Sequence, residues 1–295
     1  MARIAAALLL LPLQALAEEP IRNLEGNSFF VEEAYNMDEG HVAQTVTMRR
    51  DRGGDWMLVS SQDWALGSSL HQGGFAFAYG RQQGPGSAAG AADTALNYRF
   101  QVADGDEGLA LSPRLTVTWP TGSPALGLGT GGVGFAANLP ASKRWGNWGA
   151  THLNLGGGHT PSGKGADGAS LATTFLAAGG SVAWAPLGEV NLLLETLFTR
   201  SWAAGAATDS LVVSPGVRFG TDLGAVKLVG GLSAPLGVLP ADRRFAVIGY
   251  FSIDLPARWP GVVASQGAAE ERGEELAATG PRRVRQGVLV AQAEE

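Results

Sequence analysis

Apolar residues recur at every second position along most of the chain from Ala95 onward. Between Leu96 and Val102, one face carries Leu, Tyr, Phe and Val while the other carries Asn, Arg and Gln. Because successive side chains of a β-strand point to opposite sides of the sheet, this period of two predicts strands rather than helices. The stretch from Leu109 to Trp119 repeats the alternation. The sequence therefore predicts an all-β protein.

The same alternation continues, with varying clarity, through about twelve segments. From the third segment onward, long glycine-rich links alternate with tight turns such as Asp104-Gly105-Asp106. The expected long links cover residues 81–93, 120–131, 160–168, 201–208 and 236–243. The expected strands cover residues 41–50, 55–63, 74–80, 94–103, 108–119, 132–142, 148–159, 169–185, 189–200, 209–220, 224–235 and 244–254.

Short turns on one rim and longer loops on the other are typical of outer-membrane β-barrels. A strand of about ten residues, rising about 3.3 Å per residue and tilted near 40°, spans roughly the 25 Å apolar band of such barrels. A closed sheet also leaves no unpaired edge in the hydrocarbon. The sequence therefore predicts a transmembrane antiparallel β-barrel of about 12 strands over residues 41–255, with an N-terminal periplasmic segment and a charged C-terminal tail.

The first residues have the features of an export signal. Arg3 precedes an apolar run from Ile4 to Leu13, and Ala15-Leu16-Ala17 is a small-x-small cleavage site. We expect a signal peptide over residues 1–17 and export to the outer membrane of a Gram-negative bacterium. Residues 18–40 then form the periplasmic segment, and residues 256–295, rich in Ala, Glu, Arg and Gly, form a flexible charged tail.

Composition narrows the classes of function. A charged fraction of 16% is low for a soluble domain, which makes a secreted soluble β-protein the weaker alternative. The formal net charge of −6 gives no electrostatic reason to expect nucleic-acid binding. The chain has no cysteine and four histidines, which excludes thiolate metal sites and cysteine nucleophiles. We therefore expect no metal, no cofactor and no catalytic residues.

Parity along the expected strands places a set of polar side chains on the inner face. Cations outnumber anions in this set although the chain is acidic overall. A charge in a narrow channel needs water or a partner, so these residues are expected to line the lumen and to set its selectivity. They are Arg49, Arg99, Arg114, Arg218, Lys227, Glu195, Asn97, Asn138, Asn154, Asn191 and His152.

An apolar and acidic cluster lies just before the first expected strand. It consists of Phe29, Phe30, Glu32, Glu33 and Tyr35. One hypothesis is that residues 18–40 fold into or across the periplasmic mouth. The two glutamates would then pair with inward arginines, and the three aromatic residues would form an apolar plug. The alternative is a disordered periplasmic leader.

Several stretches resemble a known family. They read Phe29-Phe30-Val31-Glu32-Glu33-Ala34-Tyr35-Asn36, Leu96-Asn97-Tyr98-Arg99-Phe100, Leu111-Ser112-Pro113-Arg114-Leu115, Pro120-Thr121-Gly122 and Asn138-Leu139-Pro140-Ala141-Ser142-Lys143-Arg144. Together they resemble the bacterial outer-membrane transporter family associated with the phenol meta-cleavage degradation pathway, over about residues 29–255. The resemblance implies an outer-membrane channel for small, aromatic or hydrophobic compounds, and it brings no established binding residues. The tail after residue 255 departs from the family pattern.

These observations predict a channel or transporter that passes small solutes through the barrel lumen without covalent chemistry. Its expected partners are membrane lipid, a small-molecule solute and the outer-membrane assembly machinery. Two alternatives stay open. One is an outer-membrane lipolytic barrel enzyme, in which His152 and Asn154 would activate a serine that the sequence does not identify. The other is a structural barrel with a closed lumen.

Overall fold

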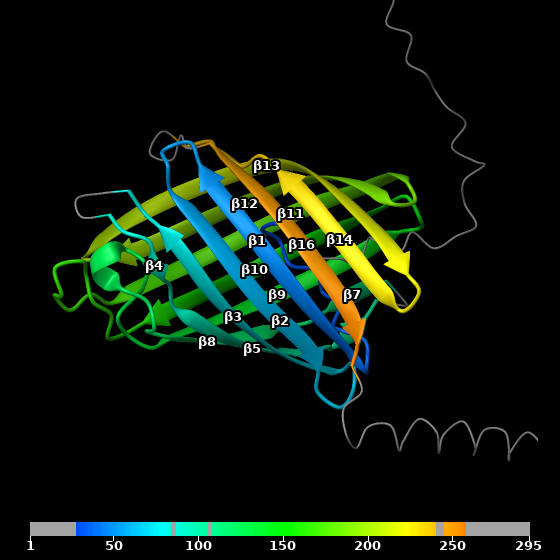
Figure 1. The fold of residues 1–295 in the computed structure, drawn as a ribbon, viewed down its shortest axis with the longest axis horizontal. Helices are drawn as coiled ribbons and strands as arrows, with labels where there is room; N and C mark the ends of the chain where they lie inside the picture. The colour runs from blue at the N-terminus through cyan, green and yellow to red at the C-terminus, as the bar shows by residue number, and fades with distance from the viewer. Residues whose placement is uncertain (1–27, 84–86, 106–107, 240–244, 258–295) are drawn as a thin grey trace, which may run out of the picture. The chain divides into compact units, whose positions relative to one another are not determined.

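The structure, a computed structural model, describes residues 28–83, 87–105, 108–239 and 245–257. In this part of the chain, twelve long strands close into an antiparallel β-barrel (Figure 1). They are β1 (His41–Asp51), β2 (Trp56–Ala65), β3 (His71–Arg81), β5 (Thr94–Phe100), β8 (Arg114–Trp119), β9 (Gly134–Trp145), β10 (Gly149–Thr160), β11 (Thr173–Leu187), β12 (Val190–Ala203), β13 (Ala206–Leu223), β14 (Val226–Ser233) and β16 (Ala246–Pro256).

Each barrel strand pairs antiparallel with the barrel strand that follows it in the chain. The sheet closes because β1 pairs with β16 in continuous register, from His41 opposite Pro256 to Asp51 opposite Ala246. The expected fold class, an all-β antiparallel barrel of about 12 strands, is confirmed. None of the helices among the described residues is long and apolar enough to cross a membrane.

Small elements occupy the connections. They are β4 (Gly90–Ala91), which pairs with β3; β6 (Ala103–Asp104) and β7 (Leu109–Leu111), which pair with each other; the short 3-10 helix η1 (Pro124–Leu126); and β15 (Leu236–Gly237), which pairs with β13.

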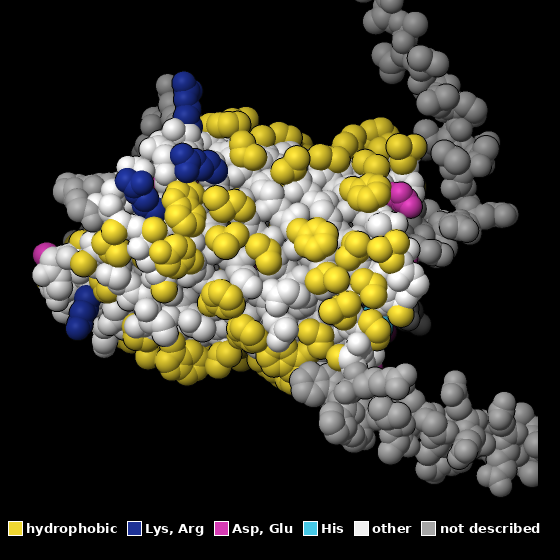
Figure 2. All heavy atoms as spheres, viewed as in Figure 1, with side chains coloured by type: hydrophobic (Ala, Val, Ile, Leu, Met, Phe, Trp, Pro, Cys, Tyr) yellow, Lys and Arg dark blue, Asp and Glu magenta, His cyan; other side chains and the backbone are white. Residues whose placement is uncertain are grey.

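The two faces of the strands differ as the alternation predicts. On β10, the outward side chains of Leu153 and Leu155 are each 64% exposed, whereas His152 between Thr151 and Leu153 is fully buried. Apolar side chains are spread over the front of the barrel, and charged side chains appear there only toward its two ends (Figure 2). This distribution matches a barrel whose exterior contacts lipid and whose interior is polar. Three tryptophans near strand ends, Trp119, Trp148 and Trp184, are exposed, as aromatic residues at the membrane interface are.

The two ends of the barrel differ in the length of their connections. At the end where β1 finishes, the connections 82–93, 120–133, 161–172 and 234–245 are long. At the end where β1 begins, three of the connections are short and consist of residues 146–148, 188–189 and 224–225. The expected alternation of loops and turns is therefore present at most positions.

The expectation of a long link over residues 201–208 is wrong. β12 continues to Ala203 and β13 starts at Ala206, so only Ala204 and Gly205 join them. Both have positive φ angles, 51° and 77°, as a two-residue hairpin turn of the favoured hand requires. The small residues that suggested a loop form an extended hairpin instead.

The expectation of a single strand over residues 108–119 is also wrong. The chain divides after Leu111, and Ser112 and Pro113 separate β7 from β8. Proline has no backbone N–H to donate to a neighbouring strand, which favours a break at this point. β7 still pairs with β9, so the alternation of faces continues across the break.

The predicted signal peptide (residues 1–17), residues 18–27 of the predicted periplasmic segment and residues 258–295 of the predicted tail (256–295) lie outside the described residues.

Candidate functional site

Residues 28–38, which we call the lumen segment, lie against the inner wall of the barrel. Val31, Glu33 and Ala34 are almost fully buried. The segment has no helix or strand, so its backbone N–H groups have no partners in regular structure. A buried N–H group that lacks a partner is costly, so these groups need acceptors on the barrel wall.

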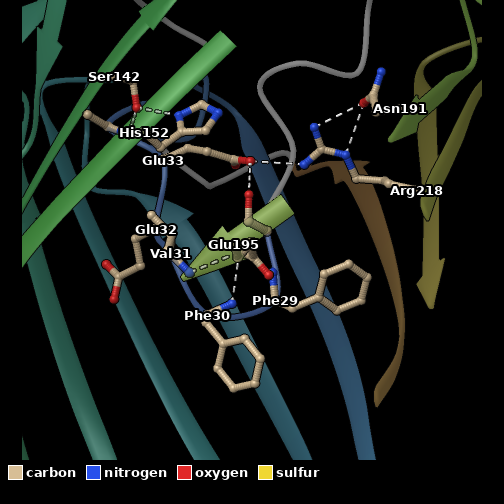
Figure 3. Close-up of polar contacts among 12 residues, drawn as sticks. Phe29, Phe30, Val31, Glu32, Glu33, Ser142, His152, Asn191, Glu195 and Arg218 are labelled. Carbon is tan, nitrogen blue, oxygen red and sulfur yellow. Dashed lines mark hydrogen bonds and ion pairs between the residues drawn. The ribbon is translucent and has the colours of Figure 1, made fainter. Parts of the chain in front are cut away.

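The main acceptor is the carboxylate of Glu195, which points inward from β12 and is itself fully buried. Its Oε1 accepts hydrogen bonds from the backbone N–H groups of Phe29, Phe30 and Val31, each at 3.1 Å (Figure 3). Three successive donors converge on one carboxylate oxygen. Hydrogen bonds to a charged acceptor are the stronger ones, so Glu195 fixes the start of the segment against β12.

Other polar side chains of the wall continue this pattern along the segment. The Asn154 side chain accepts from the Glu32 N–H at 2.8 Å and donates to the Glu32 carbonyl at 2.7 Å. Ser142 Oγ accepts from the Ala34 N–H at 2.8 Å. Two glutamines of the wall accept from later N–H groups of the segment, Gln101 from Asn36 at 2.7 Å and Gln72 from Met37 at 2.8 Å. Side chains of the wall therefore accept hydrogen bonds from most of the backbone N–H groups of the segment.

The deeper of two ion pairs joins Glu33 of the segment to Arg218 of β13. Arg218 Nη1 lies 2.9 Å from Glu33 Oε1, and both side chains are almost completely buried. Arg218 also donates to Asn191 Oδ1 from Nε at 3.1 Å and from Nη2 at 3.0 Å. Burial raises the pKa of Glu33, and the adjacent Arg218 guanidinium opposes that rise.

The second ion pair is less buried. Arg114 Nη1 of β8 lies 2.6 Å from Glu32 Oε1, and the side chains are 30% and 27% exposed. Both glutamates therefore pair with inward arginines, as the sequence hypothesis expects. Arg99 of β5 makes a different contact, because its guanidinium donates to the Glu33 carbonyl.

Glycines in the wall make room for Phe29. A Cβ on Gly216 would lie 2.7 Å from the Phe29 ring, and one on Gly231 would lie 2.9 Å from it. The Phe29 ring also packs edge-on against Tyr250, with 5.2 Å between ring centres. Only a residue without a side chain permits this approach, so the wall has a niche for this one aromatic side chain.

The other two aromatic residues of the segment lie apart from this niche. The Tyr35 ring lies 5.4 Å from the Arg144 guanidinium, and burial, with the nearby Glu33 charge, raises the pKa of Tyr35 to about 12. Phe30 lines a cavity of about 440 Å³ that remains beside the segment. Phe29 and Tyr35 also line this cavity, so the three rings share it although their other neighbours differ.

This cavity lies between the segment and the sector of the wall formed by β1, β2, β3, β5, β8, β14 and β16. Its lining is mainly polar, with Asn97, Arg99, Arg114 and Lys227 on the wall and Glu32 on the segment. Asp63 and Asp254 add two acidic groups from β2 and β16. The lumen is therefore not completely filled by side chains and the segment.

The structure places every expected lumen residue on the inward face of its strand. Arg49 lies at the rim, where it pairs with Asp51 at 2.9 Å. Asn97 accepts from Thr116, and Asn138 donates to Asn154 at 3.1 Å. Six of the remaining inward residues contact the segment or line the cavity: Arg99, Arg114, Arg218, Lys227, Glu195 and Asn154. Asn191 and His152 act through Arg218 and Ser142, respectively.

The structure also supplies a serine for His152. Ser142 Oγ lies 2.7 Å from His152 Nδ1, a distance that would suit a nucleophile and its base. Both side chains are almost fully buried, and Ser142 also accepts the Ala34 N–H. Asn154 contacts Glu32 and Asn138 rather than this pair. The pair thus holds the lumen segment and is not open to a substrate in this state.

The described residues include no group of three or more His, Asp or Glu side chains placed to hold a metal ion. The sequence reasoning missed Ser142, Gln101, Gln72 and the two niche glycines. Inward parity marks Ser142, Gln101 and both glycines, but it does not show that they contact the segment. Gln72 lies before the expected strand 74–80, so parity does not mark it.

No family model matches the chain, and no curated protein matches its sequence. Solved structures do match. An outer-membrane channel from Pseudomonas putida F1 has a TM-score of 0.56 at 13% identity, covering 75% of this chain and 98% of that one. The β-domain of the Bordetella autotransporter BrkA has a TM-score of 0.43 at 16% identity, covering 73% and 99%. LpxR from Salmonella typhimurium has a TM-score of 0.41 at 9% identity, covering 71% and 99%.

At this level of identity the similarity concerns the fold, and only the Pseudomonas structure among these three exceeds a TM-score of 0.5. Together with the apolar exterior and the polar interior, it shows that this chain has the fold of an outer-membrane β-barrel.

Proposed function

We propose that the chain is an outer-membrane channel that passes small solutes through the lumen without covalent chemistry. The observation that carries this proposal is the polar cavity of about 440 Å³ that remains beside the lumen segment. A structural barrel would be expected to fill its interior with packed side chains. A barrel enzyme would need an accessible nucleophile, whereas Ser142 is almost fully buried.

Selection by such a channel rests on width and on charge. Twelve strands about 4.8 Å apart and tilted near 40° give a backbone diameter of roughly 24 Å. Inward side chains and the lumen segment reduce this bore to the dimensions of small molecules. The charged groups that line the cavity then favour some solutes over others, as rings of charged side chains do in other pores.

The proposed solutes are small aromatic or hydrophobic compounds, the class implied by the resemblance to the family associated with phenol meta-cleavage. The cavity supports this proposal because rings and polar groups both line it. Phe29, Phe30 and Tyr250 present aromatic surface, and Asn97 and Arg114 present hydrogen-bond donors. A phenolic compound, with one apolar ring and one polar group, has matching chemistry.

We also propose how the chain reaches the membrane. Residues 1–17 would direct export as a signal peptide, and the outer-membrane assembly machinery would insert the barrel. The lumen segment would then fold into the periplasmic mouth as a plug.

Deleting residues 18–40 tests the role of the segment. We expect the single-channel conductance in planar bilayers to rise several-fold, because the polar wall would then face an unobstructed bore. Heat-modifiable migration on a gel would verify that the barrel has folded. A folded deletion variant with the conductance of the full chain would contradict the proposed constriction, and no conductance from either protein would favour a closed structural barrel.

Charge selectivity offers a second test. Replacing Arg114 by glutamate reverses one charge in the cavity wall, so we expect ion preference to shift from anions toward cations. The reversal potential in a salt gradient measures this shift. Arg200→Glu is the matched control, because Arg200 faces outward on β12. An unchanged reversal potential for Arg114→Glu would contradict the assignment of Arg114 to the conducting path.

A further inference from the structure

Two outward arginines flank a tryptophan on the exterior of the barrel. Arg50 of β1 lies directly opposite Trp56 of β2, and Trp56 lies directly opposite Arg81 of β3. Because neighbouring strands lie about 4.8 Å apart, the backbones of the two arginines are separated by roughly 10 Å. We call these three residues the arginine row.

The arginine row lies at the edge of the apolar surface. The next outward positions on the same three strands are Met48, Leu58 and Tyr79, which are also in register with one another. They are 38%, 40% and 47% exposed. The row therefore lies where a lipid-facing surface gives way to the polar rim. Figure 2 shows the Lys and Arg side chains of this face gathered at that same end of the barrel.

The charge of the row is not balanced by nearby acidic groups. Among the described residues, neither Arg50 nor Arg81 has an acidic partner. Arg81 Nη2 donates to Ser87 Oγ at 3.2 Å, and its buried Nε has no hydrogen-bond partner. Asp51 points inward and pairs with Arg49, while Asp55 accepts from the backbone N–H of Gln83. The positive charges of these two guanidinium groups are therefore not neutralised by an acidic side chain among the described residues.

Guanidinium groups bind phosphate through paired hydrogen bonds, and an indole ring suits the interfacial region of a bilayer. The row also lies at the end where β1 finishes, the end with most of the long connections, which in outer-membrane barrels is the extracellular end. A ligand there must bring both an anionic headgroup for the arginines and acyl chains for the apolar surface below them.

We propose that the arginine row binds the phosphate headgroup of a phosphorylated lipid in the outer leaflet. The acyl chains of the lipid would lie along Met48, Leu58 and Tyr79, and the phosphate would lie between the two guanidinium groups. This site is on the exterior of the barrel, so it is independent of solute passage through the lumen.

Native mass spectrometry of the full chain in a neutral detergent tests the proposal, with diphosphorylated lipid A as the probe. We expect a specific adduct, and we expect the double variant Arg50→Gln/Arg81→Gln to bind about 30-fold more weakly, since each cation near the surface contributes about a factor of five. Lipid A without its phosphates should bind the wild-type chain no better than the double variant binds the intact lipid. Inorganic phosphate at millimolar concentration should not displace the lipid.

The matched control is Arg200→Gln. Arg200 also faces outward near the same end, but its Nε lies 2.9 Å from Asp209 Oδ1, so its charge is already balanced. This variant should bind lipid A as the wild type does. Equal binding by the double variant, equal binding of the dephosphorylated lipid, equal loss in the control, or displacement by free phosphate would each overturn the proposal. Heat-modifiable gel migration shows that each variant is folded.

Discussion

Replacing Glu195 by alanine is expected to release the lumen segment and to raise the conductance to nearly that of the chain lacking residues 18–40. The substitution removes the acceptor of three backbone N–H groups, those of Phe29, Phe30 and Val31. Each buried N–H group left without a partner costs about 1–3 kcal/mol. A total of even 3 kcal/mol changes the ratio of docked to released segment by roughly 150-fold, and single-channel recording would show this as longer and larger openings.

One further variant separates the effect of losing the charge of Glu195 from the effect of losing its side chain, and a second variant is a control for charge. Glu195→Gln keeps one acceptor oxygen of the same shape, so its conductance should lie between that of the wild type and that of the alanine variant. Glu189→Gln removes a negative charge from the turn before β12, away from the segment, and should leave the conductance unchanged. If the deletion variant conducts strongly while Glu195→Ala behaves like the wild type, Glu195 does not anchor the segment.

The placement of the lumen residues could be predicted from sequence because the side-chain period of a strand is fixed. Once the alternation identifies a strand, the direction of every side chain on it follows, as it does for Arg218 and Asn154. The sequence also predicts that the two glutamates of the segment pair with arginines, because a cationic interior needs counter-charges.

The choice of partners could not be predicted in the same way. Glu33 and Arg218 are 185 positions apart in the chain, and their contact depends on how the barrel closes and how deep the segment lies. The alternation of apolar and polar positions determines neither how the barrel closes nor how deep the segment lies. The sequence therefore identifies the inward arginines as candidate partners of the two glutamates, but it does not show which arginine pairs with which glutamate.

The anchoring role of Glu195 was missed for a different reason. Opposite charge identifies acids that could balance the inward arginines, whereas Glu195 binds uncharged backbone N–H groups. Every residue except proline has a backbone N–H group, so the sequence does not indicate which of these groups Glu195 binds. The niche glycines present the same difficulty, because Gly216 and Gly231 are two of 43 glycines and only the structure brings Phe29 against them.

Replacing Arg218 by methionine is expected to lower the free energy of unfolding by about 3–5 kcal/mol, the usual cost of leaving one member of a buried ion pair without its partner. Glu33 is 3% exposed, and with Arg218 removed its carboxylate would keep only the hydrogen bond from Ser28 at 2.9 Å among the described contacts. Either the barrel loses this stability or the segment leaves the lumen. Reversible urea unfolding in lipid vesicles measures the first outcome, and conductance measures the second.

A double-mutant cycle with Glu33→Gln distinguishes the pair from simple loss of packing. Glu33→Gln removes the buried negative charge, so the double variant Arg218→Met/Glu33→Gln should recover most of the stability lost in Arg218→Met. The matched comparison is Arg114→Met, whose pair with Glu32 is about 30% exposed and should contribute only about 1 kcal/mol. Equal effects of Arg218→Met and Arg114→Met, or no recovery in the double variant, would contradict the view that the buried pair with Arg218 holds the segment. Both pairs consist of an arginine and a glutamate in direct contact, so the larger effect at Arg218 follows from its deeper burial and from its additional hydrogen bonds to Asn191.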